Sequence, residues 1–350
     1  MIYTNQTVEE LEKYRCTSSG IFDALNSIWM KINYVFSFTI IIATFFMLIP
    51  AVKVLKFHNV YSSGTQFLLF VILLVSCVNQ VAFLEIKIRQ LIQLLKFSDD
   101  PCKIEFHSSE CYYDNTIHIF TFYLLMWLVW SLTLDRFLAL FAGNLSDRQI
   151  ISRRISYGFV VGALLLTING HLLVYSGVSR AGFVPNCMYP PQMALNSYQT
   201  ANDIMITFIL INCFVTMLLF CFIMYRDHRM RHRNYDTRIR YSSFENVITT
   251  KSIFIITITQ LFFSCIASLS VTIIRIFETN MSEYTFHIVV QYVSATLYGN
   301  FSIPCLIYLQ TTQCIKRRRS KINALTSLTD KLDMRISHLK QAWEHDRRIH

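Results

Sequence analysis

Charged residues are scarce in this 350-residue sequence: they make up 15% of it, and hydrophobic residues make up 53%. A soluble domain usually has about 25% charged residues. The sequence also lacks a secretory signal peptide, because residues 1–28 mix acidic, basic and polar residues and contain no short apolar core or cleavage site. These absences predict a polytopic membrane protein whose first apolar run directs its own insertion.

Motifs for catalysis and for cofactor or metal binding are absent as well. The sequence shows no zinc-ligand spacing, no phosphate-binding loop and no nucleophile motif. Among the ionisable residues in or at the rims of the apolar runs we single out Asp135, Arg136, Asp203 and Arg275, and we expect none of them near a membrane midplane. We therefore expect no enzyme, no cofactor and no bound metal. A transporter that depends on a mid-membrane acid or a broken helix is also disfavoured.

Long apolar runs dominate what is present. Runs of about 20 apolar residues are long enough to cross a bilayer as helices. The sequence has seven, at Ile32–Val54, Gln66–Ile86, Thr116–Phe141, Ile155–Tyr175, Asn202–Tyr225, Ser252–Phe277 and Phe286–Leu309. This pattern predicts an all-α integral membrane protein with a seven-transmembrane-helix bundle. It divides the chain into an N-terminal segment at 1–31, a membrane domain at 32–309 and a tail at 310–350.

Positive charge is distributed unevenly between the two sets of connecting segments. The segments 53–60, 142–154, 226–251 and 310–350 hold 22 Lys and Arg residues, and the segments on the opposite side hold 8. Because basic loops stay in the cytoplasm, this asymmetry predicts an extracellular N-terminus and a cytoplasmic C-terminus. The formal charge of +10 is thus a property of loops, and we expect no nucleic acid partner.

The predicted topology also sorts the glycosylation sequons. Asn5 begins a sequon in the N-terminal segment, so we expect it to be glycosylated. Asn280 begins another in the short outer loop before the last span. Asn144 matches the pattern too, but it lies on the predicted cytoplasmic side, where it should remain unmodified.

The third apolar run follows Cys111 and closes with Asp135 and Arg136. As a helix, the stretch from Cys111 to Arg136 is about 37 Å long, slightly more than a hydrocarbon core of about 30 Å. One helix therefore places a thiol at one membrane face and an ion pair at the other. A snorkelling arginine explains the charged end but not the cysteine. The combination resembles the third helix of rhodopsin-like seven-helix receptors.

Four of the ten cysteines lie in predicted outer segments: Cys16, Cys102, Cys111 and Cys187. An even number in an oxidising compartment favours disulfides, and four cysteines permit three pairings. We favour Cys111 with Cys187, which ties the outer loop at 177–200 to the third helix. Cys16 and Cys102 then form the second pair.

Polar and aromatic residues in the outer halves of the spans are candidates to line a ligand cavity. For any one of them, an interhelical hydrogen bond or a packing role is the alternative. The seventh span has no lysine, which excludes an opsin-type Schiff base there, and the third has no acid above Asp135 to hold an amine. The candidates are His118, Tyr123, Trp127, Asn169, His171, Asp203, Arg275, His287, Gln291 and Tyr292, together with Asn79 and Gln80 of the second span.

The predicted cytoplasmic segments are basic. The loop at 226–251 carries seven Lys and Arg residues and suits an acidic partner or anionic membrane lipid, or it sets orientation alone. In the tail, apolar residues recur at spacings of three and four from Ile322 to Trp343, which predicts an amphipathic helix that lies on the membrane or forms a coiled coil. Cys314, next to a basic run, suits palmitoylation.

Three stretches together resemble the nematode serpentine receptor class alpha family of chemoreceptors. They are the N-terminal Tyr14–Ser19, the closing Leu132–Arg136 of the third span, and Arg240–Lys251 leading to Ile258–Gln260. The last stretch is the most specific, and the resemblance covers nearly the whole chain up to about Lys321.

The resemblance implies a G-protein-coupled receptor in the plasma membrane of sensory neurons or their cilia. Such a receptor binds a small odorant or pheromone-like molecule outside and activates a heterotrimeric G protein inside, with Asp135 and Arg136 as the coupling residues. The chain departs from the rhodopsin-like pattern, because spans four to six have no proline and the Asn300 to Tyr308 stretch only loosely matches the usual switch in the seventh helix. The alternative is a seven-helix ligand-gated channel or a transporter. Channels of the insect odorant type resemble an inverted arrangement with the N-terminus inside the cell, and the distribution of Lys and Arg disfavours that orientation.

Overall fold

The computed structural model describes the backbone of residues 16–58, 60–141, 148–178, 180–188, 195–233, 237–277, 280–292 and 295–346. Its elements in chain order are α2 (Ser19–Asn26), α3 (Ile28–Phe57), α4 (Ser63–Lys96), β1 (Phe106–His107), α5 (Ser108–Phe141), α6 (Arg148–Val174), β2 (Phe183–Val184), α7 (Leu195–Arg233), α8 (Thr237–Phe277), α9 (Glu283–Tyr292) and α10 (Ala295–Asp346).

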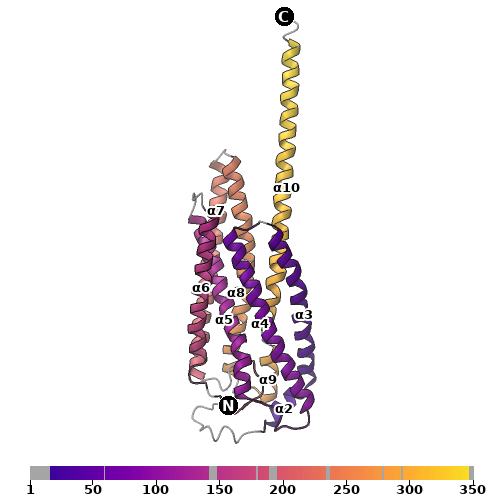
Figure 1. The fold of residues 1–350 in the computed structure, drawn as a ribbon, viewed down its shortest axis with the longest axis vertical. Coiled ribbons are helices and arrows are strands. Elements are labelled where there is room, and N and C mark those ends of the chain that lie inside the picture. Colours follow the sequence, from indigo (N-terminus) through magenta and orange to yellow (C-terminus); the bar gives the residue numbers. More distant parts are fainter. Residues whose placement is uncertain are drawn as a thin grey trace.

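The long helices lie side by side in an elongated bundle (Figure 1). Six of the described helices, α3 to α8, are long and apolar enough to cross a membrane. The seventh predicted span, Phe286–Leu309, is divided between α9 and the start of α10. The predicted all-α membrane fold is confirmed. Its helices are longer than their apolar runs, because α4 continues past Ile86 to Lys96 and α5 begins at Ser108.

Serine caps mark where two of these helices begin. The Ser27 hydroxyl accepts a hydrogen bond from the Met30 amide at 3.2 Å, and α3 follows. The Ser62 hydroxyl accepts one from the Thr65 amide at 3.4 Å, at the start of α4. Each bond satisfies a backbone N–H that has no partner within its helix, so both starts are encoded locally.

Helices α4 and α5 form the centre of the bundle. In their most apolar stretches 56% and 67% of residues are buried, against 17% for α6 and 22% for α7. The main apolar cluster joins α4 and α5 to α8 and α10 through Leu69, Leu128, Ile253 and Ile303. Large apolar side chains such as Phe214 of α7 point outward, as expected of surfaces that face lipid.

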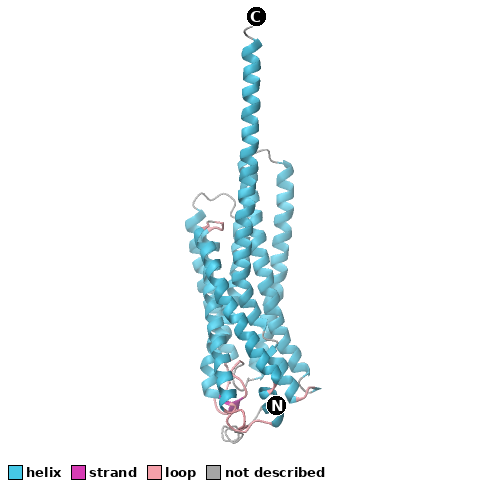
Figure 2. Cartoon of the chain, turned by 90° about the vertical axis from the view of Figure 1, so that its right-hand side faces the viewer, coloured by secondary structure: helices cyan, strands magenta, loops and turns pink. Residues whose placement is uncertain are grey.

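Loops at one end of the bundle are tied together covalently. Disulfides join Cys16 to Cys102 and Cys111 to Cys187, the same pairs that the sequence analysis favours. A short antiparallel sheet pairs β1 with β2 beside them, and it lies at the end of the bundle opposite the C-terminus (Figure 2). We call this the disulfide end, and the opposite end, which holds Asp135 and Arg136, the Asp135 end.

The C-terminal tail continues the last helix of the bundle. Helix α10 has 52 residues, about 78 Å at the usual helical rise, and projects well beyond the other helices (Figure 1). The predicted boundary at residue 310 therefore falls inside one helix. The tail's side chains from residue 324 onward lie outside the described residues, so its amphipathic face stays a prediction.

Candidate functional site

Asp135 and Arg136 form a buried ion pair near the end of α5. Arg136 Nη2 lies 2.6 Å from Asp135 Oδ2, and each residue is 7% exposed. Thr65, in the first turn of α4, donates its hydroxyl to the same Asp135 oxygen at 2.6 Å and also accepts a hydrogen bond from Arg136. The pair is thus held within α5 and fastened to α4.

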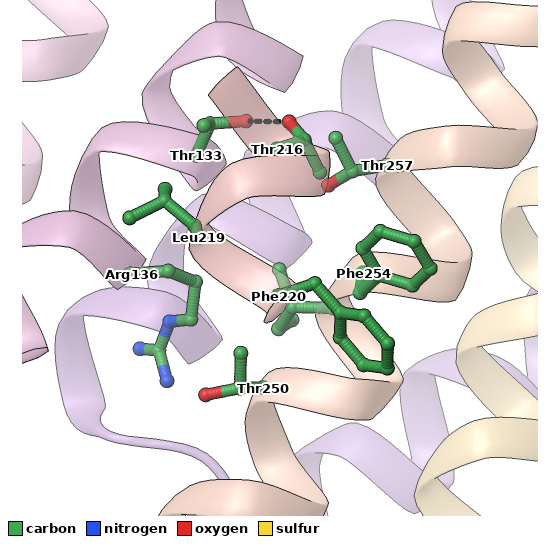
Figure 3. A pocket seen from close by; sticks show the side chains of 9 residues that line it. Thr133, Arg136, Thr216, Leu219, Phe220, Thr250, Phe254 and Thr257 are labelled. Atoms are coloured by element: carbon green, nitrogen blue, oxygen red, sulfur yellow. Dashed lines mark hydrogen bonds between the residues drawn. The ribbon is translucent and has the colours of Figure 1, made fainter. Parts of the chain in front are cut away.

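A small cavity opens beside this pair, between α5, α7 and α8 (Figure 3). The Thr133 and Thr216 hydroxyls bridge α5 and α7 at 3.1 Å, and the Phe220 and Phe254 rings stack between α7 and α8 at 4.1 Å. Its lining residues are Thr133, Arg136, Thr216, Leu219, Phe220, Thr250, Ile253, Phe254 and Thr257. Separation of α8 from α7 would enlarge this space next to Arg136.

A polar network joins α4, α5 and α10 inside the bundle, further from the Asp135 end. The amide nitrogen of Asn79 donates to the His118 carbonyl at 2.9 Å and to the Thr121 hydroxyl at 2.6 Å. Asn79 Oδ1 accepts from Asn300 at 2.6 Å. All four residues are buried. Such a network fixes helix positions, because each buried amide keeps its partners only in this arrangement.

Lys87 is a buried cation that sequence reasoning missed. It is 0% exposed, and its Nζ donates to Gln291 Oε1 at 2.7 Å and to Asn33 Oδ1 at 3.3 Å, joining α4 to α9 and α3. The predicted second span ends one residue earlier, at Ile86. Helical spacing is the signal that could have indicated its burial. Lys87 continues a series of α4 positions that are three and four residues apart and all buried: Ser76, Gln80, Phe83, Lys87, Gln90 and Leu94.

A polar cleft lies at the disulfide end, between α4 and the loop that follows it. Arg89 pairs there with Glu110 at 2.9 Å and with Asp114. Burial raises the pKa of the Glu105 carboxyl above its usual value. The cleft is lined by Arg89, Ile92, Gln93, Phe97, Cys102, Lys103, Glu105, Phe106, His107, Glu110 and Phe183. Both signs of charge therefore face solvent at this opening.

The structure places several of the predicted ligand residues inside the bundle, in separate contacts. His118 and Gln291 are buried and belong to the polar contacts described above. Tyr123 is buried in an apolar cluster with α6 and α7. The ring of Trp127 lies edge-on to Phe208 with centroids 5.0 Å apart.

Two others lie nearer the disulfide end. The His171 ring meets Phe120 edge-on and lies tilted against Tyr175. Tyr292 donates its hydroxyl to the Trp29 carbonyl at 2.6 Å. Both side chains are engaged in contacts between helices.

Asn169 and Asp203 do not join this group. Both are exposed on the outward faces of α6 and α7, and Asn169 donates to the Leu165 carbonyl of its own helix at 3.1 Å. His287 is half-buried beside Phe286. The side chain of Arg275 lies outside the described residues.

Two predicted modification sites have different outcomes. Asn5 lies outside the described residues. Cys314 is 1% exposed, and its sulfur lies 2.8 Å from the Ser252 hydroxyl, between α8 and α10. An acylated cysteine must reach lipid, so this position does not suit palmitoylation.

Comparison with known proteins agrees with the architecture. The family model for the serpentine type 7TM GPCR chemoreceptor Sra matches residues 11–343. Serpentine receptor class alpha-27 of Caenorhabditis elegans is 49% identical to this chain over 98% of it and 99% of the relative. Serpentine receptors class alpha-18 and alpha-20 of the same nematode are 32% and 30% identical, each over 97% of this chain and 100% of the relative. The chain therefore belongs to the Sra family of seven-transmembrane G-protein-coupled chemoreceptors.

Proposed function

We propose that this multi-pass membrane protein binds a small environmental chemical at its disulfide end, outside the cell, and activates a heterotrimeric G protein at its Asp135 end. The observation that carries the proposal is the buried Asp135–Arg136 pair beside the cavity between α5, α7 and α8. An arginine at a helix end, held by a neighbouring carboxylate and by α4, suits a switch that is released when helices separate.

The coupling works as a two-state element in this proposal. In the closed state Arg136 is bound by Asp135 and Thr65, and the stacked Phe220 and Phe254 hold α7 against α8. Ligand binding at the other end favours a state in which α8 moves away from α7. Arg136 then leaves its partners and meets the G protein in the enlarged cavity.

Family membership supports a sensory location. We propose that the protein resides in the plasma membrane of sensory neurons or their cilia and takes part in olfaction. The basic segment at 226–251 and the basic residues of the tail then face anionic lipid and the G protein.

The proposal is tested by G-protein activation normalised to the amount of receptor at the cell surface. Arg136→Ala should keep surface expression and ligand binding but lose signalling. Arg136→Lys should not fully restore it, because lysine lacks the planar fork that bonds a carboxylate and a hydroxyl together. Wild-type coupling by Arg136→Ala would show that the arginine is only a topological anchor.

A further inference from the structure

Lys87 has no acidic partner among the described residues. Both acceptors on its Nζ, Gln291 Oε1 and Asn33 Oδ1, are neutral amide oxygens. Nζ also lies over the rings of Tyr34 and Phe83, 5.5 and 5.4 Å from their centroids. No carboxylate among the described residues lies within ion-pair distance of it, and a buried ammonium without a counter-ion is costly.

The acidic side chains that form ion pairs at this end of the bundle are bound to bases other than Lys87. Glu110 and Asp114 bind Arg89, and Asp100 binds Lys103 at 2.8 Å. A second base lies nearby, because the His118 ring lies 5.5 Å from the Phe83 ring that Lys87 also contacts. Lys87 and His118 thus flank one aromatic ring and bring no negative charge with them.

A buried apolar cluster adjoins the cation. Phe83 packs in it with Ile41 of α3, Leu297 of α10 and Met188. Met188 directly follows Cys187, so the disulfide to α5 holds it at this cluster. Asn33 and Gln291 reach the cation from α3 and α9. The site therefore combines one positive charge, two amides and a short apolar wall.

We propose that Lys87 binds the carboxylate of the receptor's ligand, and that the ligand class is small aliphatic monocarboxylic acids. This inference rests on the proposed chemosensory function and names its substrate class. The carboxylate takes the place of Gln291 Oε1 on Nζ and accepts from the Asn33 amide, while the alkyl chain packs on Phe83 and Met188. A hydrogen bond between two ionised groups replaces one from the ammonium to a neutral amide oxygen, and the ion pair is the stronger interaction in a dry site.

The proposal also explains how ligand binding at Lys87 affects the Asp135 end of the bundle. Gln291 lies in the last turn of α9, and its backbone carbonyl accepts from Asn33 at 3.3 Å. Displacing its side chain from Lys87 loosens the contact between α9 and the pair α3 and α4. Helix α9 immediately precedes α10, which runs to the Asp135 end.

The test uses purified full-length protein in neutral detergent and needs no G protein. Thermal unfolding is followed with straight-chain carboxylic acids, with the corresponding primary alcohols, and with chloride at equal ionic strength. Wild type should be stabilised by at least one acid and not by its alcohol or by chloride. Lys87→Met keeps about the same side-chain volume but leaves Gln291 Oε1 and Asn33 Oδ1 without this donor. The shift caused by each acid is therefore measured against the ligand-free unfolding temperature of the same protein.

Lys87→Met should weaken binding of that acid about tenfold or more, as expected for loss of a charged hydrogen bond. The control is Lys96→Met, the same change at an exposed position of α4, which should bind the acid like wild type. Equal acid binding by Lys87→Met and wild type, equal stabilisation by acids and alcohols, or no stabilisation by any acid would overturn the proposal. If acids bind through Lys87 but no G protein responds, the ligand class stands and the proposed coupling fails.

Discussion

Thr65 is the residue that fastens the coupling pair to a second helix. Its hydroxyl donates to Asp135 and accepts from Arg136, so one side chain on α4 steadies both charges. A valine of the same shape removes both hydrogen bonds. Toward α4, Arg136 then keeps only a long contact, 3.5 Å, with the Ser62 hydroxyl at the start of that helix.

We expect Thr65→Val to raise basal signalling about twofold to tenfold, the shift in a two-state equilibrium that corresponds to one net hydrogen bond. The measurement is ligand-free G-protein activation per receptor at the cell surface. Thr39→Val is the control, because the Thr39 hydroxyl is exposed and bonds the Val35 carbonyl of its own helix. Basal signalling equal to wild type in Thr65→Val would show that the contact with α4 does not restrain Arg136.

The protonation of Glu105, in the polar cleft, makes the stability of the protein depend on pH. Because burial raises the pKa of its carboxyl, the folded state favours the protonated form. The contribution of Glu105 to stability is therefore complete below the usual glutamate pKa of about 4.3 and is lost as pH rises through the folded value. Glu105→Gln mimics the protonated form. It should unfold at a higher temperature than wild type at neutral pH, and the difference should vanish near pH 4.

Thermal unfolding of the two purified proteins across this pH range measures the effect. Asp23→Asn, a change in α2 at the same end of the bundle, serves as a comparison for general loss of negative charge. A difference between Glu105→Gln and wild type that grows toward acid pH would contradict the assignment.

At the scale of the helices, sequence patterns predicted where apolar runs lie but not which way they face. Helices α6 and α7 are apolar on nearly all sides, so the spacing of their apolar residues does not indicate which face is buried. Asn169 and Asp203 were accordingly assigned to a cavity, although they face outward. In α4 the buried residues do recur at helical spacing, but the predicted span ends at Ile86, directly before Lys87. Its partners on α3 and α9 come from distant parts of the sequence and are visible only in the fold.

The disulfide between Cys111 and Cys187 joins a helix to a loop, so no packing between two long helices holds these elements together. It ties α5 to the loop before α7, where the Asn115 amide donates to the Cys187 carbonyl at 3.2 Å. Cys111→Ser and Cys187→Ser should each reduce surface expression, since such a bridge contributes about 2–4 kcal/mol. The surface expression of the double variant should be no lower than that of either single variant.

Surface labelling of tagged receptor measures this effect. Cys221→Ser changes an exposed free cysteine of α7 and should be expressed like wild type. Peptide mapping of surface protein without reductant should recover the linked peptides. Finding both thiols free in wild type would contradict the account.

For the whole molecule, the basic segments predict the orientation. We expect Asn5 to be glycosylated and the end of α10 to lie in the cytoplasm. Glycosidase treatment and protease protection of a C-terminal tag measure the two ends. Asn144, a sequon on the predicted cytoplasmic side, should stay unmodified. An unmodified Asn5 together with an extracellular tag would reverse the arrangement and place Arg136 outside.

The seven apolar runs and the family resemblance were enough to predict the class of fold, a bundle of membrane-spanning helices. They did not show that the seventh span is divided between α9 and α10, because hydropathy continues across both helices. They also did not show that the tail continues α10 as one helix. The division depends on how α9 and α10 pack against α3 and α8, whereas the tail projects beyond these helices.

The central claim is that release of Arg136 from Asp135 activates a G protein, and it can be measured without a known ligand. Guanine-nucleotide exchange on a purified heterotrimeric G protein is followed with purified wild-type receptor, Asp135→Asn, and Asp135→Asn combined with Arg136→Ala. Asp135→Asn should accelerate exchange above wild type, since the amide no longer neutralises the arginine, and the double variant should return exchange to the rate without receptor. Equal acceleration by Asp135→Asn and the double variant would contradict the account.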